Sequence, residues 1–293
     1  MGLLKKYLNI LKCPNTWEDL HIDWDFLINK SGTFKYKIYD DNFIELLPNK
    51  PYPVNIQSSW IHDNSFYHGQ LNKLIDFSID TSDARGQIDD LPEGYQVFIK
   101  NELKLIKEEV KNKNKRVAID ISAWVWTYTF ELAKKYDLVI HFDLWDKSLV
   151  YAYNKAKKLG INNILFVRWD WFKFPFQENI ADLIISIDFF IYYDIKDDIK
   201  VINDMYSLLN NKWIIFADFH HSKPFFHNKK IHEYTNNEIL YLKDNVKWKD
   251  KKIIKFCSIP TFLLRWKIFQ NIEKWLNKIS CFFVRWIIII QKK

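Results

Sequence analysis

The chain has 293 residues, 48% of them hydrophobic and 27% charged, which predicts a globular protein with one substantial core. Its net charge of +7 comes mostly from lysines spread along the chain, so a phosphate-binding stripe is disfavoured. The three cysteines form no CxxC pair, which argues against a disulfide framework and against a four-ligand zinc site. We expect a cytoplasmic protein without a signal peptide or transmembrane segment, because no apolar run is long enough for either.

The first segment, residues 1–53, is predicted to form a small β-rich module. Short alternating apolar runs are separated by turn residues such as Asn29-Lys-Ser-Gly32, a pattern typical of strands joined by tight turns. Residues 54–115 are predicted to form a helical connecting region, because 65–77 and 94–110 carry apolar residues at helical spacing.

From residue 116 to residue 293 the pattern changes to alternating strands and helices. The strand-like runs are continuous rather than alternating, as in strands buried on both faces, and helices between such strands imply a parallel sheet. We therefore predict a Rossmann-like, doubly wound α/β sheet of seven strands with helices on both faces. The five expected parallel strands are 116–121, 138–143, 164–167, 183–188 and 213–218. The expected helices between them are 128–135, 147–159 and 195–209.

The last two strands of this sheet are predicted at 253–259 and 282–290, as an antiparallel hairpin. Residues 262–279 between them have helical apolar spacing, including Trp266, Phe269 and Ile272. Packing against the core is the favoured role of this helix. A basic amphipathic helix on a membrane or lipid substrate is the alternative.

Four predicted strands in succession each end in or near a carboxylate. In a doubly wound sheet, ligands bind at the carboxyl ends of the strands near the switch point. A single aspartate at such a position is more often a helix cap or turn former. The whole set, in this order and spacing, favours a ligand site, and its members are Asp120, Asp143, Asp170 and Asp188.

Residues 117–219 resemble the class I S-adenosylmethionine-dependent methyltransferase family. Asp120 matches the acid of the family's first motif, and Asp143 matches the second acid, which binds the ribose hydroxyls. Trp169-Asp170 with Pro175-Phe176 resembles the motif whose aspartate lies by the adenine amino group. The resemblance implies methyl transfer from S-adenosylmethionine. The residues that it places at the cofactor are Asp120, Ser122, Trp124, Trp126, Asp143, Asp170, Trp171 and Asp188.

Two further segments carry the same resemblance. Residues 186–193 are similar to the segment that borders the methyl group in the family, and residues 208–213 are similar to the turn before the family's fifth strand. No catalytic residue is assigned. Tyr192, Tyr193 and His220 are candidates for a general base by position only.

The family's first motif has glycine at the positions of Ser122, Trp124 and Trp126. Glycine there lets backbone amides approach the ligand closely, whereas tryptophan fills the space of the methionine moiety. The chain has only 6 glycines against 13 tryptophans, while about 7% glycine, roughly 20 residues, is usual. We hypothesise that the gene uses UGA as a glycine codon, and that this codon was read as tryptophan. Trp17, Trp124, Trp126, Trp169 and Trp213 are the positions concerned.

The amino-terminal module resembles the small zinc-ribbon-like domain often fused ahead of such methyltransferases. The resemblance is carried by Lys12-Cys-Pro14 and by the closing Ile44-Glu-Leu-Leu-Pro48. Because Cys13 has no CxxC partner, we expect no metal and a structural or docking role.

The sequence therefore predicts methyl transfer to a small-molecule or lipid-like acceptor. One alternative is a non-catalytic methyltransferase-like protein with a blocked cofactor loop. Another is an rRNA methyltransferase, given the basic charge, although a nucleic acid partner is not favoured. A nicotinamide oxidoreductase is disfavoured because no G-x-G-x-x-G follows the first strand.

Overall fold

Eleven strands form a single sheet in the computed structural model, which describes residues 2–49, 88–111, 115–123, 127–170, 173–190, 194–221, 232–246, 251–256, 266–272 and 285–292. The strands are β1 Leu20–Asp23, β2 Phe26–Asn29, β3 Lys35–Asp40, β4 Phe43–Glu45, β5 Val117–Ile121, β6 Leu138–Asp143, β7 Ile164–Arg168, β8 Ala181–Ser186, β9 Leu209–His220, β10 Lys251–Phe256 and β11 Arg285–Gln291. The helices are α1 Leu3–Tyr7, α4 Glu93–Glu109, α5 Thr127–Ala133, α6 Asp146–Lys158, α7 Ile195–Leu208 and α8 Asn236–Asn245, with short 3-10 turns at Leu8–Ile10 and Ile88–Asp90.

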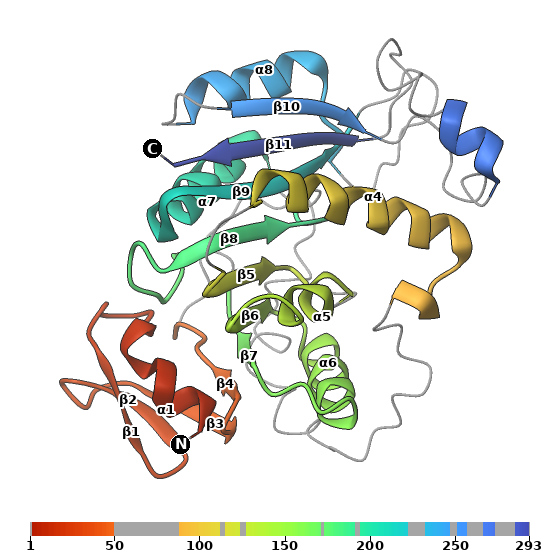
Figure 1. The fold of residues 1–293 in the computed structure, drawn as a ribbon. Helices are drawn as coiled ribbons and strands as arrows, with labels where there is room; N and C mark the ends of the chain where they lie inside the picture. The colour runs from red at the N-terminus through yellow and green to blue at the C-terminus, as the bar shows by residue number, and fades with distance from the viewer. Residues whose placement is uncertain are drawn as a thin grey trace.

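The order of the strands is β1-β2-β3-β4-β7-β6-β5-β8-β9-β11-β10. Strands β5 to β9 pair in parallel, and their arrowheads point to the same edge in Figure 1. The chain builds outward from β5 through β6 to β7, then returns to the other side of β5 for β8. The switch point of the winding therefore lies between β5 and β8. The predicted Rossmann-like, doubly wound sheet is confirmed.

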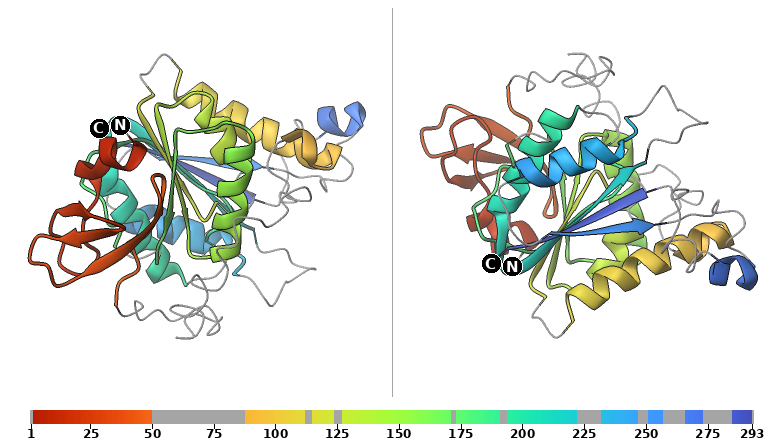
Figure 2. Two further views of the ribbon diagram at one scale, coloured as in Figure 1. Left: turned by 90° about the horizontal axis from the view of Figure 1, so that it is seen from below. Right: turned by 90° about the horizontal axis from the view of Figure 1, so that it is seen from above.

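Two apolar layers lie on opposite faces of this sheet. Helices α7 and α8 pack on one face, through residues such as Ile202 and Leu242. Helices α4, α5 and α6 pack on the other, through residues such as Ile99, Phe130 and Val150. Figure 2 shows the sheet edge-on between these two sets of helices. Continuous apolar strands are required because both faces are covered.

The predicted closing hairpin is confirmed. Strand β11 runs antiparallel to β9, and β10 runs antiparallel to β11. The predicted helix at 262–279 lies mostly outside the described residues, of which 267–272 are helical. Trp266 and Ile272, which the periodicity assigns to a buried face, are exposed here. Across the helices that the structure describes, none is both long enough and apolar enough to pass through a bilayer.

The sheet is wider than the seven strands predicted, because the amino-terminal strands extend it. Phe43 and Ile44 of β4 pair in parallel with Phe166 and Val167 of β7, so an edge that would otherwise be open is covered. The predicted division of the chain at residue 53 remains a prediction. The predicted helix at 65–77 lies outside the described residues.

A buried ion pair joins the amino-terminal strands to the central sheet. Arg168, at the end of β7, is 1% exposed. Its guanidinium donates to Glu45 Oε2 of β4 at 3.0 Å and to the Leu144 carbonyl at 3.1 Å. Removing Glu45, whose side chain is 25% exposed, would leave the buried charge of Arg168 uncompensated, so this pair favours the observed register of β4 on β7.

The turn expected at 208–213 is instead part of a strand. Strand β9 already begins at Leu209, which pairs with Ala181, and the register then shifts so that Leu183 pairs with Ile214. Lys212 has a φ of 68°. The segment predicted as a turn is therefore a register shift within the strand pairing, of the kind that a bulge produces by accommodating extra residues.

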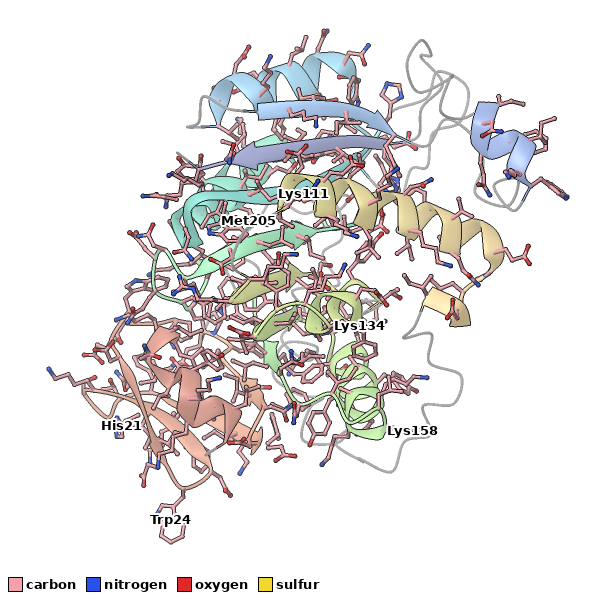
Figure 3. All side chains as sticks on the ribbon, viewed as in Figure 1. His21, Trp24, Lys111, Lys134, Lys158 and Met205 are labelled. Carbon is pink, nitrogen blue, oxygen red and sulfur yellow. The ribbon has the colours of Figure 1, made fainter. Side chains whose placement is uncertain are left out.

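Two tryptophans of the amino-terminal module have backbone conformations that favour glycine. Trp17 has a φ of 65°, after a turn closed by its amide on the Cys13 carbonyl, and Trp24 has a φ of 53°. Trp24 is the first residue of a two-residue hairpin loop, since Asp23 pairs with Phe26, and such loops favour glycine at this position. Its side chain is 92% exposed and projects away from the molecule in Figure 3.

We predict that Trp24→Gly raises the free energy of unfolding by about 1 kcal/mol, because a side chain at positive φ is strained and this one contributes almost no burial. Urea denaturation measures the change. Trp24→Ala keeps the Cβ atom and should gain less than glycine. A lower denaturation midpoint for the glycine variant would contradict the prediction.

Candidate functional site

Three of the four predicted aspartates are buried at the carboxyl edge of the parallel strands. Asp120 in β5, Asp143 at the end of β6 and Asp170 beyond β7 are 2%, 1% and 0% exposed. Asp188 lies two residues beyond β8, and its side chain is 42% exposed. Asp120 and Asp143 lie close enough that the charge of Asp143 adds to burial in raising the pKa of Asp120.

Asp120 is held by the helix that follows its strand. Thr129 Oγ1 of α5 donates to Asp120 Oδ2 at 2.5 Å and lies 2.9 Å from His141 Nδ1. Burial raises the pKa of Asp120 to about 7, and burial lowers the pKa of His141 to about 3. The imidazole is therefore neutral, and the hydroxyl that donates to Asp120 accepts from Nδ1–H.

The raised pKa of Asp120 has a consequence for stability. Between the ordinary pKa of aspartate and about 7, the folded chain holds a proton at Asp120 that the unfolded chain has lost. Stability therefore falls as pH rises through this window, by about 1.4 kcal/mol per pH unit for one proton. We predict that Asp120→Asn makes the dependence of the unfolding free energy on pH shallower between pH 4 and 7.

Chemical denaturation at several pH values tests this prediction. The exposed Asp25→Asn is the control and should leave the slope unchanged. An unchanged slope in Asp120→Asn would show that the carboxyl group stays ionised throughout.

The residues after β5 bend over the end of β6. Ser122 has a φ of 58°, and its amide donates to the Phe142 carbonyl at 2.9 Å. This is the left-handed conformation that the resemblance implies at a glycine position. Three other cofactor positions were predicted in the loops that follow the parallel strands. They lie outside the described residues and are Trp124, Trp126 and Trp171.

Asp143 holds the start of the helix that follows β6. Its Oδ1 accepts from the Trp145 amide at 3.0 Å, and its Oδ2 accepts from Ser148 Oγ at 3.2 Å. Burial raises the pKa of Asp143 to about 6. Asp143 therefore does have the structural role at a helix start that an aspartate after a strand commonly has. The Leu144 amide also contributes to Asp143, so three of the about four hydrogen bonds that a carboxylate can accept are accounted for.

The position before Asp170 is part of the core. Trp169 is 0% exposed, and its ring lies 5.2 Å from that of Phe142 and is stacked on Phe174 at 5.3 Å. Its indole Nε1 is buried without a hydrogen-bond partner. Neither Trp169 nor Trp213 has a positive φ, so at these two positions the glycine hypothesis has no support from the backbone.

Asp188 belongs to a second cluster, which sequence reasoning did not assemble. His220 Nε2 of β9 lies 2.8 Å from Asp188 Oδ1, and Arg285 of β11 lies 2.9 Å from the same oxygen. Arg285 also contacts the buried Asp218. The sequence could have indicated Asp218, because it ends a predicted strand. No pattern in the sequence near Asp218 indicates its contact with Arg285. Tyr192 and Tyr193 lie outside the described residues.

Comparison with known proteins supports one family. Residues 112–255 match the model of a methyltransferase domain. A comparison with curated proteins gives no match. The match confirms the predicted resemblance, while the zinc-ribbon-like likeness of the amino-terminal module remains a prediction.

Solved structures share the fold at low identity. Phosphoethanolamine N-methyltransferase 2 of Haemonchus contortus is 17% identical with a TM-score of 0.51, covering 66% of this chain and 53% of that one. Geranyl diphosphate methyltransferase is 10% identical with a TM-score of 0.51, covering 68% and 80%. The 4+2 cyclase SpnF is 12% identical with a TM-score of 0.52, covering 68% and 82%. The chain thus spans about half the length of the first of these structures.

Proposed function

We propose that this chain, which belongs to the class I methyltransferase family through its domain at residues 112–255, transfers a methyl group from S-adenosylmethionine to a small-molecule or lipid-like acceptor. The observation that carries the proposal is the pair of buried carboxylates, Asp120 and Asp143, at the ends of adjacent strands beside the switch point. The structures named for phosphoethanolamine and geranyl diphosphate methylation support a small acceptor.

The described residues fit an adenosine-containing methyl donor. The resemblance assigns the ribose hydroxyls to Asp143, whose carboxylate is an acceptor, and the adenine amino group to Asp170, which lies beyond the next strand end. Ser122 sets the backbone of the loop that would approach the methionine moiety. S-adenosylmethionine supplies an electrophilic methyl group, so the chain must mainly hold the acceptor close and in line with it.

A non-catalytic binding protein is the second candidate. The buried, bulky Trp169 at a position where the resemblance implies glycine favours it.

A transfer assay separates the two candidates. The full chain, with glycine at positions 124 and 126, is incubated with S-adenosylmethionine labelled in the methyl group and with catechol, ethanolamine, a phospholipid vesicle or ribosomal RNA. We expect label in at least one small-molecule or lipid product. Binding of S-adenosylmethionine without transfer to any acceptor would favour the binding protein, and label only in RNA would favour the rRNA methyltransferase.

A further inference from the structure

Three side chains from different elements meet at the carboxyl edge, next to the switch point. Asp188 follows β8, His220 is the last residue of β9, and Arg285 begins β11, where it is paired directly with His220. The Asp188 amide donates to Asp218 Oδ1 at 2.7 Å, which fixes the backbone that carries the Asp188 carboxylate. The residues that the resemblance places beside the methyl group, 186–193, include Asp188.

The carboxylate of Asp188 is kept ionised by its neighbours. Burial alone would raise its pKa, but the charge of Arg285 and the hydrogen bond from His220 outweigh it, and the pKa lies below the usual range. Two further acidic groups lie near Arg285. Burial raises the pKa of Asp218 and raises that of Glu102 to about 8, so both take up protons more readily than Asp188 does.

The position of Arg285 favours an internal ion-pair network over a metal site in this cluster. Ligand atoms of Asp188, Asp218 and His220 come within 4.8 Å of one another, as they would around a metal ion. The guanidinium, however, contacts both carboxylates and supplies the positive charge itself. Glu102 and Tyr128, which are hydrogen-bonded to each other on the adjoining helices, face the same charge. The cluster is therefore complete as an internal ion-pair network.

The ionised Asp188 sets the tautomer of His220. A carboxylate only accepts hydrogen bonds, so the contact of 2.8 Å requires a proton on Nε2, and in the neutral imidazole the lone pair is then on Nδ1. No side chain among the described residues binds Nδ1. The His220 side chain is 21% exposed, whereas Arg285 and Asp218 below it are 11% and 0% exposed. His220 is thus partly exposed at the carboxyl ends of the strands, above an ion-pair network that is more deeply buried.

We propose that His220 is the general base of the reaction and that Asp188 is the residue that positions it. This inference rests on the proposed methyl transfer and narrows the acceptor to a group that carries a removable proton, a hydroxyl or an amine. The acceptor's O–H or N–H bond breaks, and its proton moves to His220 Nδ1. The acceptor's electron pair forms the bond to the methyl carbon, while the carbon–sulfur bond of the donor breaks with its pair remaining on sulfur. The imidazolium is stabilised by Asp188, as in other histidine–carboxylate pairs.

The first test needs no turnover. Nitrogen-15 spectra of the imidazoles in the chain without methyl donor should show His220 protonated at Nε2 and bare at Nδ1. Asp188→Asn should alter this pattern, because the amide can donate to Nε2 and reverse the tautomer. A wild-type His220 that carries its proton on Nδ1 would overturn the proposal.

The second test compares rates. His220→Gln should lower the rate of transfer to catechol or ethanolamine by about 100-fold or more, with the affinity for S-adenosylmethionine unchanged. The exposed His21→Gln on β1 is the matched control and should retain the wild-type rate. A His220→Gln rate equal to that of wild type would overturn the proposal.

The assignment of His220 as the base and the proposed methyl transfer can be tested separately. If wild-type protein transfers methyl groups and His220→Gln does so equally well, only the assignment of the base is wrong. If wild-type protein transfers to no acceptor, the proposed function is wrong, and the tautomer measurement still reports on the geometry. Should His220→Gln fail to fold, Asp188→Asn provides both readouts.

Discussion

Replacing both Trp124 and Trp126 with glycine will allow the chain to bind S-adenosylmethionine at least about 100-fold more tightly, a gain of about 2.7 kcal/mol. The physical reason is that glycine lets the methionine moiety approach the backbone of the loop closely. The loop after β5 begins at Ser122 in the left-handed conformation, and the resemblance puts the methionine moiety against the backbone that follows. A backbone amide can approach a ligand closely only where no bulky side chain intervenes.

Isothermal titration with S-adenosylmethionine measures this gain. Trp24→Gly is the matched control, because it removes an exposed indole from a hairpin loop of the amino-terminal module and should not change the affinity. If the chain with both tryptophans binds as tightly as the glycine variant, the cofactor loop is not blocked and this explanation of the sequence is wrong.

Replacement of Asp143 is the second change with a large expected effect. Asp143→Asn should weaken binding of S-adenosylmethionine by about 10-fold or more in a chain with glycine at 124 and 126, because a hydrogen bond to a charged group contributes about 1.5–3 kcal/mol. The asparagine keeps the shape of the side chain but replaces one accepting oxygen with a donor.

Asp182→Asn provides a matched control for this experiment. Asp182 is also a buried aspartate that accepts two backbone amides, those of Arg116 and Val117, at 2.7 and 3.2 Å. It lies at the start of β8, at the opposite edge of the sheet. This variant should lose stability without losing affinity. If Asp143→Asn leaves the affinity of the chain with glycine at 124 and 126 unchanged, Asp143 does not belong to the ligand site.

The alternation of apolar runs was enough to predict the parallel sheet. Each strand from β5 to β8 is buried on both faces, so its sequence is a short continuous apolar run that differs clearly from the helices between. The carboxylates were predictable for the same reason, since each follows such a run. The boundary of β9 was wrong because Leu209 satisfies both a helix end and a buried strand.

Contacts between distant segments could not be predicted. Arg285 reaches Asp218 across 67 residues of sequence, and Arg168 reaches Glu45 across 123. Neither arginine lies in a local pattern that indicates its partner, because the pairing depends on which strands become neighbours. The extension of the sheet by β4 was missed for this reason.

The hypothesis that some tryptophans stand for glycine is also supported at Trp24, which lies outside the family's first motif. Sequence reasoning selected Trp17 but not Trp24, because a hairpin loop carries no family motif. Of the seven tryptophans within the described residues, these two have positive φ, whereas only a few per cent of residues other than glycine do so. Their backbones support glycine at 17 and 24 independently of the resemblance, which concerns 124 and 126.

Tandem mass spectrometry of peptides from the protein made in its own cell tests the central claim most directly, that the native chain has an open cofactor loop. The account predicts glycine at positions 17, 24, 124 and 126, with UGA at the corresponding codons of the gene. Tryptophan at 124 and 126, encoded by UGG, would contradict it and would leave the non-catalytic binding protein as the better account.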